Sequence, residues 1–432
     1  MQWSNIPRFM LAAAASGSGK TTVTCGLLQA LQNRGCKVAS FKCGPDYIDP
    51  MFHQKVIGTH SRNLDLFFMQ SDVVHYLLAK NGAGKDVSLL EGVMGFYDGL
   101  GGNTTIASSY DLAKTTKTPV ILVVNCKGMS VSVAAQNKGF LSFGPDAGIA
   151  GVILNQVSAM LYPTLKSVIE TELSIRVLGY LPYLPECFLE SRHLGLVTAQ
   201  EITDLQKKLQ QLAAQLEKSV DIDGLLQIAG AAAPIGWQEP GVFQQKIEQP
   251  VKIAIAQDEA FCFYYQDSLD LLAELGAELL PFSPLHDEML PDDIDGLYLG
   301  GGYPELYGRQ LAANTSIKEQ LQTMIQQGIP CLAECGGFMY LQESLEAMDG
   351  QHYPMVGAIS GKAYRTTKLQ RFGYITLTAE EDNMLCQKDE SIPAHEFHYW
   401  DSTNCGAGFL AEKANKKRNR HCIDTGKNLF AG

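Results

Sequence analysis

The chain has 432 residues, more than one hydrophobic core usually serves, so we expect two or three domains. Its composition, 46% hydrophobic and 19% charged, suits a globular protein, and its apolar runs are too short to span a membrane. The net charge of -12 argues against general nucleic-acid binding. Because the first residues lack the pattern of a secretory leader and the 11 cysteines include no C-x-x-C pair, we expect a cytoplasmic protein with reduced thiols.

The first predicted strand, residues 9–15, runs into a glycine-rich loop that opens a helical pattern over residues 23–31. This order is typical of a phosphate-binding loop, because glycines let backbone N–H groups turn toward phosphate oxygens and the helix N-terminus adds partial positive charge. Ala14 replaces the first glycine of the usual pattern, and a helix N-cap with flexible glycines is the alternative interpretation. The predicted nucleotide-binding residues are Ser16, Gly17, Ser18, Gly19, Lys20, Thr21 and Thr22, with Lys20 on the outer phosphates and Thr21 on Mg²⁺.

Further apolar segments, separated by helical patterns, predict the rest of a parallel sheet that is covered by helices on both faces. The predicted strands are residues 37–42, 87–90, 120–124 and 149–154, and the helices between them include 72–79 and 129–141. Ligands of such sheets gather at the carboxyl ends of the strands. The residues that follow each strand are therefore the candidates for a site.

Four polar side chains lie at that edge. Glu91 directly follows a strand, at a position where a carboxylate holds Mg²⁺ directly or through water. Asp46 and Asp98 lie in loops after strands, and we expect them to bind metal or to orient a nucleophile. The alternative is that these acids cap turns or helices, because Asp is a common turn residue. Asn155 ends a later strand and is expected either to read a nucleotide base or to serve in a plain turn.

The pattern changes over residues 196–250. A polar helix is predicted over residues 200–219, and residues 231–241 are rich in Pro and Gly. We interpret this stretch as a helical segment and interdomain linker. The expected domains are therefore residues 1–195 and 251–432.

The second domain repeats the alternation of strands and helices. Strands are predicted at residues 251–256 and 296–299, and helices at about 264–276 and 317–327. The expected fold class is α/β, with two doubly wound domains built on mostly parallel sheets.

Cys335 lies between an apolar strand and a helix, with glycines after it. A sharp strand-to-helix turn exposes a nucleophile, and the helix N-terminus beneath it is expected to lower the thiol pKa and favour the thiolate. The glycines of a neighbouring loop, Gly301 and Gly302, together with Gly336, are expected to offer N–H groups to an oxyanion. The alternative is a buried structural cysteine.

A cysteine nucleophile needs a base, and two histidines are candidates. His395 and His398 lie in a strand-like segment, three residues apart, so their side chains are expected on opposite faces. Each is either the base or a hydrogen-bonded structural histidine, and the sequence leaves the base open.

Six spaced motifs together carry a resemblance over nearly the whole chain. They are residues 16–22, 42–50, 91–98, 300–305, 333–337 and 395–399. In this order the motifs resemble the cobyrinate a,c-diamide synthase family, which amidates tetrapyrrole carboxylates. The N-terminal half resembles the dethiobiotin synthetase-like P-loop NTPase fold. The C-terminal half resembles class I glutamine amidotransferases, in the branch shared with cobyric acid synthase.

The resemblance implies two linked reactions. ATP and Mg²⁺ would phosphorylate a carboxylate in the amide synthetase domain, where Lys20 and Thr21 bind phosphate and Mg²⁺, and Asp46, Glu91 and Asp98 serve substrate activation and the metal. Cys335 would hydrolyse glutamine through a glutamyl thioester, and the ammonia would displace phosphate from the acyl phosphate. The a and c acetate side chains of cobyrinate, or of a related tetrapyrrole, would become amides in cobalamin biosynthesis.

The implied ligands are this tetrapyrrole, L-glutamine or ammonia, and ATP, with neither nucleic acid nor membrane. A homodimer is left open. One departure concerns the base, since the family's catalytic histidine follows a stretch like residues 428–432, where this chain stops. We therefore expect a chain truncated before its base, with P-loop chemistry that uses free ammonia and doubtful glutaminase activity.

Three other functions compete with this one. A ParA/MinD-like positioning ATPase would carry a signature lysine five residues before Lys20, where this chain has Ala15, and no C-terminal amphipathic membrane helix is visible. The same amidation of hydrogenobyrinate or nickel-sirohydrochlorin is open, because the sequence does not reveal the central metal. A binding module with inactive sites is the third alternative, and whether ATP turnover depends on a tetrapyrrole distinguishes it from the enzyme.

Overall fold

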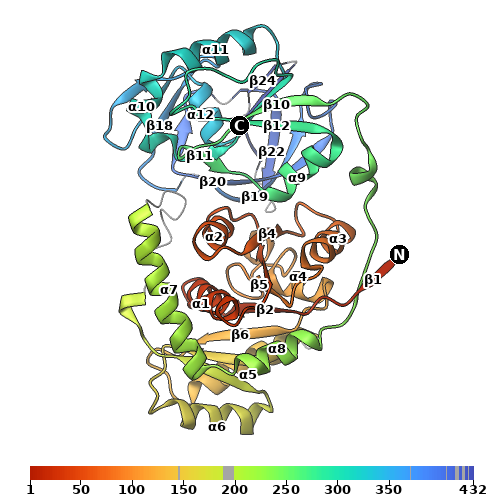
Figure 1. The fold of residues 1–432 in the computed structure, drawn as a ribbon, viewed down its shortest axis with the longest axis vertical. Coiled ribbons are helices and arrows are strands. Elements are labelled where there is room, and N and C mark those ends of the chain that lie inside the picture. The colour runs from red at the N-terminus through yellow and green to blue at the C-terminus, as the bar shows by residue number, and fades with distance from the viewer. Residues whose placement is uncertain are drawn as a thin grey trace. The chain divides into compact units, whose positions relative to one another are not determined.

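The computed structural model describes residues 1–144, 146–187, 199–369, 371–404, 406–413, 418–420, 424–426 and 428–432. Two compact units, Met1–Pro240 and Gly241–Gly432, make up the chain (Figure 1). The Pro- and Gly-rich stretch 231–241 contains the division between them, but the helical segment before it belongs to the first unit. The structure thus corrects the expected boundary at residue 195.

The first unit is built on a seven-stranded sheet in the order β4-β3-β5-β2-β6-β7-β8, with every pair parallel. Its strands are β2 Arg8–Ala13, β3 Val38–Cys43, β4 His60–Leu64, β5 Val87–Glu91, β6 Val120–Asn125, β7 Ile149–Asn155 and β8 Val177–Leu181. These strands are almost continuously buried, as expected of a parallel sheet covered on both faces. A short antiparallel pair, β1 Gln2–Ser4 and β9 Ile235–Trp237, lies outside the sheet.

Helices flank this sheet (Figure 1). They are α1 Lys20–Asn33, α2 Ile48–Phe52, α3 Ser71–Gly82, α4 Ser109–Thr115, α5 Ser132–Phe143, α6 Tyr162–Leu173, α7 Ala199–Ser219 and α8 Ile222–Gly230. The predicted helices over 72–79, 129–141 and 200–219 correspond to α3, α5 and α7.

Helix α7 packs on α1 and is part of the core. Leu209, Leu212 and Leu216 of α7 are fully buried in the cluster that also contains Leu27 and Leu28 of α1. Gly26 permits this approach, because a Cβ there would lie only 2.5 Å from Leu216 Cδ1 and 2.7 Å from Leu212 Cγ. The predicted helical segment therefore serves as a layer of the first unit and not as a linker.

The second unit contains a six-stranded sheet in the order β12-β10-β13-β15-β25-β24. Its strands are β10 Val251–Ala256, β12 Ala277–Phe282, β13 Gly296–Leu299, β15 Cys331–Ala333, β24 Asp424–Gly426 and β25 Leu429–Ala431. All pairs except β24 with β25 are parallel, which confirms the expected mostly parallel α/β sheet. The helices are α9 Gln266–Leu275, α10 Gly308–Ala313, α11 Thr315–Gln326 and α12 Gly336–Leu341.

Smaller sheets complete the second unit. Strands β11 Phe261–Phe263 and β14 Gly301–Gly302 form an antiparallel pair. One four-stranded sheet contains β16 Ser344–Glu346, β17 His352–Pro354, β18 Lys362–Arg365 and β21 Trp400–Ser402. The other contains β19 Arg371–Ala379, β20 Ser391–His398, β22 Phe409–Lys413 and β23 Arg418–Arg420, paired antiparallel. Within the described ranges, none of the helices combines the length and apolar character that crossing a membrane requires.

Candidate active sites

The glycine-rich loop connects β2 to α1, as predicted. Gly17 and Gly19 adopt φ values of 75° and 93°, a region where a side chain would strain the backbone. The loop is braced by Asn155 at the end of β7, whose Nδ2 donates to the Ser18 carbonyl at 2.9 Å. A Cβ on Gly19 would lie 2.1 Å from this Nδ2. Asn155, which the sequence offered as a base reader or a turn residue, contacts the loop backbone in this structure.

Lys20 is the first residue of α1 and is buried. Its Nζ donates to the carbonyl of Met94 at 2.5 Å and to that of Ala15 at 3.3 Å. Burial, together with the charge of Lys42, lowers the pKa of Lys20 to about 8, while nearby carboxylates oppose the shift. The ammonium therefore lies between the loop and the segment after β5, at the carboxyl edge of the sheet.

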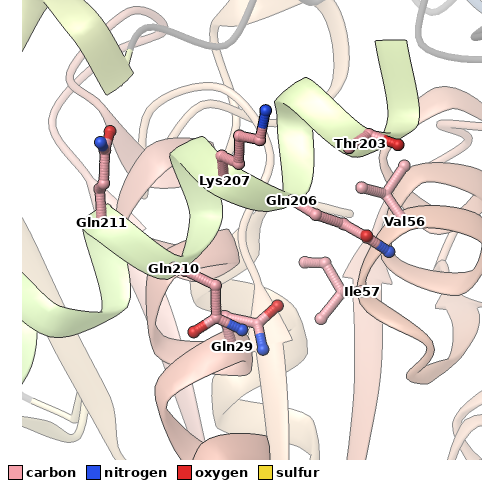
Figure 2. Close-up of a pocket in the computed structure, with 8 residues that line it drawn as sticks. All are labelled: Gln29, Val56, Ile57, Thr203, Gln206, Lys207, Gln210 and Gln211. Carbon is pink, nitrogen blue, oxygen red and sulfur yellow. The ribbon is translucent and has the colours of Figure 1, made fainter. Parts of the chain in front are cut away.

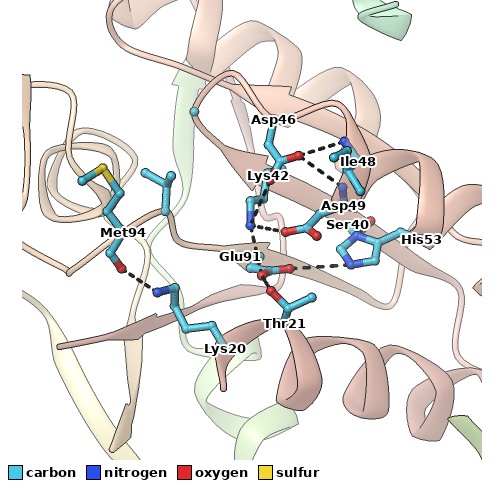
Figure 3. A network of polar contacts seen from close by, with 12 residues as sticks. Lys20, Thr21, Ser40, Lys42, Asp46, Ile48, Asp49, His53, Glu91 and Met94 are labelled. Carbon is cyan, nitrogen blue, oxygen red and sulfur yellow. Dashed lines mark hydrogen bonds and ion pairs between the residues drawn. The ribbon is translucent and has the colours of Figure 1, made fainter. Parts of the chain in front are cut away.

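A buried network of charges lies beside the loop (Figure 3). Lys42 Nζ donates to Asp49 and, at 3.0 Å, to Glu91 Oε1, and it lies 3.8 Å from Asp46 Oδ2. The Thr21 hydroxyl donates to the same Glu91 oxygen at 2.7 Å. Parallel pairing places Lys42 directly opposite Glu91. One lysine thus joins three carboxylates next to the first turn of α1.

Burial and mutual charge set the ionisation of this network. Burial opposes the charge of Lys42, but Asp49 and Glu91 outweigh it and raise the pKa of the ammonium well above its usual range. Burial raises the pKa of Glu91 to about 7 and that of Asp46 to about 6, against the charge of Lys42. The pKa of Asp49 is lowered, because Lys42 and His53 outweigh its burial.

Three residues of this network were not predicted as site residues: Lys42, Asp49 and His53. A lysine within a fully buried strand was the available signal for Lys42, because a buried charge requires a partner. His53 begins a turn of π-helix, His53–Ile57, and is fully buried. Its Nε2 lies 3.6 Å from Glu91 Oε2 and its Nδ1 lies 3.4 Å from Ser40 Oγ. Burial lowers the pKa of His53 to about 4, so the imidazole is neutral near pH 7.

Asp46 and Asp98 both shape the backbone. Asp46 Oδ1 accepts hydrogen bonds from the N–H groups of Ile48 and Asp49 at the start of α2, which is the capping role given as the alternative. Asp98 Oδ2 accepts from the Gly95 N–H at 3.0 Å, and a Cβ on Gly95 would lie 2.3 Å from that oxygen. Asp98 also acts on the pKa of Lys20, so its charge lies near the loop.

The expected Mg²⁺ donors were Thr21, Glu91 and Asp46. Thr21 and Glu91 suit the ion, because both are oxygen donors and they are in contact with each other through Glu91 Oε1. For Asp46 the contacts are instead with the N–H groups of Ile48 and Asp49 through Oδ1 and with Lys42 through Oδ2. Among the described residues, no group of three or more His, Cys, Asp or Glu side chains is arranged to hold a metal.

A hollow of about 650 Å³ lies between α1 and α7 (Figure 2). It is lined by Gln29, Val56, Ile57, Thr203, Gln206, Lys207, Gln210 and Gln211. None of the residues predicted for either site lines it, and most of its polar groups are uncharged amides. The hollow is therefore separate from the nucleotide-binding loop.

Cys335 occupies a sharp turn between β15 and α12. Its φ of 52° and ψ of -102° lie outside the regions that a residue with a Cβ ordinarily adopts. The residue is exposed, as expected for a nucleophile and not for a structural cysteine. Its N–H donates to the carbonyl of Gly432 at 2.8 Å.

The predicted glycines converge on Cys335. A Cβ on Gly301 would lie 3.4 Å from Cys335 Cβ, and one on Gly336 would lie 3.1 Å from the Gly302 nitrogen. The N–H groups of Gly336 and Gly302 both act on the thiol and favour its ionised form. The structure thus brings Gly301, Gly302 and Gly336 around the nucleophile.

The expected lowering of the thiol pKa is wrong for this structure. Although Cys335 is open to solvent, the protein packed around its thiol raises the pKa to about 11, and the carboxylates of Glu305 and Glu334 add to the rise. The N–H groups of Gly336 and Gly302 oppose the rise only in part. The thiol is therefore protonated at neutral pH and needs a base.

His395 and His398 lie on β20, which confirms the predicted strand. His395 is opposite Tyr374 of β19 and packs edge-to-face on Phe372 and Tyr374. His398 Nδ1 bonds to the Trp400 carbonyl at 2.5 Å. Burial lowers the pKa of both rings, that of His395 to about 4. These contacts all lie within β19, β20 and β21.

Two family models match the chain, one in each unit. Residues 9–197 match the family model described as the CobQ/CobB/MinD/ParA nucleotide binding domain. Residues 252–430 match the CobB/CobQ-like glutamine amidotransferase domain. A nucleotide-binding unit joined to a glutamine amidotransferase unit defines a glutamine-dependent amidating ligase.

Three relatives named cobyrinate a,c-diamide synthase extend over most of the chain. That of Caldanaerobacter subterraneus subsp. tengcongensis is 42% identical over 98% of this chain and 93% of its own length. That of Listeria innocua is 45% identical over 94% of this chain and 90% of its own. That of Thermoplasma volcanium is 42% identical over 91% and 85%, respectively. The chain belongs to the cobyrinate a,c-diamide synthase family.

Similarity to solved structures is much lower. The cell division protein MinD of Aquifex aeolicus aligns with 54% of this chain and 99% of its own, at 15% identity and a TM-score of 0.32. A similarity of this size adds nothing to the assignment.

Proposed function

We propose that this chain converts the a and c acetate side chains of cobyrinate into amides, using ATP and ammonia from glutamine, as a step of cobalamin biosynthesis. The observation that carries the proposal is that one chain combines a nucleotide-binding loop beside a buried lysine–carboxylate network with an exposed cysteine at a strained turn. Because the reaction needs ATP and a reduced Cys335, we propose the cytoplasm as its compartment.

The first unit would activate the carboxylate. A carboxylate oxygen of the substrate attacks the γ-phosphorus of ATP, ADP leaves, and an acyl phosphate forms. Lys20 would bind the outer phosphates, and the ammonium of Lys42 supplies a second positive charge at the same edge of the sheet. Mg²⁺, held by Thr21 and Glu91, would neutralise charge on the phosphate oxygens when it is bound.

The second unit would release ammonia. The Cys335 sulfur attacks the side-chain carbonyl of glutamine, and the N–H groups of Gly301, Gly302 and Gly336 would stabilise the oxyanion. Ammonia leaves, and water hydrolyses the glutamyl thioester to glutamate. A base must take the thiol proton, since the pKa of Cys335 is raised to about 11. The contacts of His395 with Tyr374 and of His398 with the Trp400 carbonyl support a structural role for both rings.

Ammonia would complete the reaction at the first site. It attacks the acyl carbon, phosphate leaves, and the amide forms. For each side chain, one carboxylate, one ATP, one glutamine and one water give one amide, ADP, phosphate and glutamate. Acting at the a and c positions in turn, the enzyme repeats this cycle.

The test is to incubate the chain with ATP and Mg²⁺ plus either ammonia or glutamine. Cobyrinate, hydrogenobyrinate and nickel-sirohydrochlorin are supplied separately, and mass spectrometry detects replacement of hydroxyl by amino groups. We expect a diamide of cobyrinate in the presence of ammonia. A diamide of another tetrapyrrole alone would reassign the substrate. No amide from any tetrapyrrole, with ATP turnover independent of them all, would overturn the proposal in favour of a positioning ATPase.

A further inference from the structure

We propose that His53 is a positioning residue of the ATP site, whose Nε2–H group donates to Glu91 Oε2 and holds the Glu91 carboxylate in place for Thr21. In this arrangement, which we name the Ser40–His53–Glu91 relay, Ser40 lies on one side of the imidazole and Glu91 on the other. The inference rests on the proposed ATP-dependent function of the first unit.

Burial is the first observation behind the relay. His53 and Glu91 are fully inaccessible to solvent and Ser40 is 1% exposed, so water does not satisfy their polar atoms. His53 Nε2 and Glu91 Oε2 face each other at 3.6 Å (Figure 3). Over the described ranges, neither atom has a hydrogen-bond partner. A buried donor and acceptor that lack other partners and face each other are set up to pair.

The contact with the Glu91 carboxylate favours a proton on Nε2, and the Ser40 hydroxyl is compatible with it, because a hydroxyl either donates to Nδ1 or accepts from it. With the proton on Nε2, the Ser40 hydroxyl donates to the lone pair of Nδ1, 3.4 Å away. With the proton on Nδ1 alone, the lone pair of Nε2 would point at the Glu91 carboxylate, and the two would repel. A doubly protonated ring also presents Nε2–H to Glu91. With Glu91 ionised, the form that the contacts from Thr21 and Lys42 favour, the proposed donor is therefore the same in both states of the ring.

The two oxygens of Glu91 have different surroundings. Oε1 accepts from Thr21 at 2.7 Å and from Lys42 at 3.0 Å, whereas Oε2 faces His53 and accepts no hydrogen bond from the described residues. Rotation of the carboxylate about its last torsion would carry Oε1 away from Thr21. A bond from His53 to Oε2 opposes that rotation. The separation of 3.6 Å exceeds a hydrogen bond, and such bonds are often long without bound ligand and shorten when substrates bind.

The backbone holds His53 in position for this role. The residue begins the turn of π-helix His53–Ile57, and its carbonyl accepts from both the N–H and the hydroxyl of Thr59, at 3.0 and 3.1 Å. Turns of π-helix occur frequently at functional sites. The charges of Asp49 and Lys42, which belong to the network around Glu91, act on the pKa of the imidazole in opposite directions. His53 is thus fixed from both ends, by its backbone and by its ring.

Substitutions that differ in where they place an amide N–H test the relay. In His53→Gln the amide reaches the position of Nε2, whereas in His53→Asn it reaches only that of Nδ1, and His53→Leu removes both. We expect His53→Asn and His53→Leu to lower the kcat of ammonia-dependent amidation about tenfold or more, with the KM for the tetrapyrrole unchanged. His53→Gln should recover most of the activity. The exposed His60→Asn serves as the matched control, and circular dichroism checks the fold of each variant.

A spectroscopic measurement tests the same bond without turnover. In protein labelled with ¹⁵N-histidine, His53 is assigned by comparison with His53→Gln. We expect its Nε2 to carry the proton both with and without ATP and Mg²⁺, and the Nε2–H resonance to shift in Glu91→Gln. A proton on Nδ1 alone, or no response to Glu91→Gln, would overturn the relay.

The two proposals fail in different ways. If the wild type forms no amide from any tetrapyrrole, the proposed function fails, while the tautomer of His53 and its response to Glu91→Gln still test the relay. If the wild type is active and the Leu and Asn variants match it, the relay is wrong. Equal losses in the Gln and Asn variants would also overturn it, because the bond would then not run through Nε2.

Discussion

The two units each place a reactive group at a turn from a parallel strand into a helix, but they build the turn differently. In the first unit the left-handed positions are glycines, Gly17 and Gly19, and Lys20 begins a helix of 14 residues. In the second unit Cys335 itself takes the left-handed φ of 52°, before a helix of 6 residues. A glycine loop frees backbone N–H groups for an anion, whereas the strained turn presents one side chain.

The charged groups beside the two turns also differ. The first site combines two lysines with buried carboxylates, and the pKa values of Lys20 and Glu91 are shifted to about 8 and about 7. The charged groups acting on Cys335 are the carboxylates of Glu305 and Glu334, which raise its thiol pKa. The first site thus holds two buried ammonium groups among its carboxylates, whereas the second has carboxylates beside its thiol and requires a base to generate its nucleophile.

Removing the nucleophile should separate the two sites most completely. We expect Cys335→Ala to abolish glutamine-dependent amidation and to leave ammonia-dependent amidation at the wild-type rate, because the strained turn lies in the second unit and serves only ammonia release. Product formation from each nitrogen source, measured by mass spectrometry, checks this. If the wild type makes no product from glutamine, loss of Cys335 alkylation by a glutamine-like chloroketone is the readout. Loss of the ammonia-dependent reaction would contradict the division of labour.

A substitution in the nucleotide-binding loop of the first unit should have the next largest effect on amidation. We expect Lys20→Met to lower ammonia-dependent amidation about a hundredfold or more, because a preorganised charge on the developing phosphate oxygens is lost. The rate of Cys335 alkylation by iodoacetamide should stay unchanged. Steady-state rates with saturating ammonia provide the measurement. Equal effects on both readouts would indicate damage to the whole chain and not to one site.

A third experiment compares two glycines within helices of the first unit. Gly26 of α1 faces Leu212 and Leu216 of α7, whereas a Cβ on Gly139 of α5 would meet nothing within 4 Å. We expect Gly26→Ala to lower the free energy of unfolding by about 1–3 kcal/mol through overpacking, despite the better helix propensity of alanine. Gly139→Ala should raise it by about 0.5–1 kcal/mol. Urea unfolding followed by circular dichroism measures both, and a stabilised Gly26→Ala would show that α7 does not pack tightly on α1.

The local parts of each site could be predicted from the sequence, because neighbouring residues determine a strand–glycine–helix turn. The same holds for Glu91, since parallel strands end at one edge of a sheet. The partners of Glu91 could not be predicted in this way. The pairing register of β3 and β5 places Lys42 beside Glu91. A π-helical turn, which has no clear sequence signal, places His53 there. For Asp46 the functional and capping interpretations were both open, and its two oxygens serve different contacts.

The linker and the thiol pKa were misjudged for a related reason. A polar helix between two domains resembles a connection until the buried contacts of Leu212 and Leu216 with α1 are known. The expected effect of a helix N-terminus on the Cys335 pKa depends on neighbouring residues alone. The raised pKa depends on Glu305 and on packing around the thiol, to which distant parts of the chain contribute. Both errors arose where tertiary contacts outweighed a local pattern.

The smallest expected effect is that of the Glu305 charge on the pKa of the Cys335 thiol. Burial raises the pKa of Glu305 to about 7, so its carboxylate is charged in the alkaline range where the Cys335 thiol ionises. A nearby negative charge disfavours the thiolate, and Glu305→Gln removes this charge. We therefore expect the pKa of Cys335 to fall below about 11 in this variant while staying above that of an ordinary thiol, because burial remains the largest cause.

The pH dependence of Cys335 alkylation by iodoacetamide, followed by mass spectrometry, measures this shift. The exposed Glu343→Gln is the matched control and should leave the pH profile unchanged. A profile for Glu305→Gln that coincides with the wild type would mean that burial alone sets the thiol pKa. A profile displaced to higher pH would reverse the sign of the argument, and the second site could then no longer be distinguished from the first by its unbalanced negative charge.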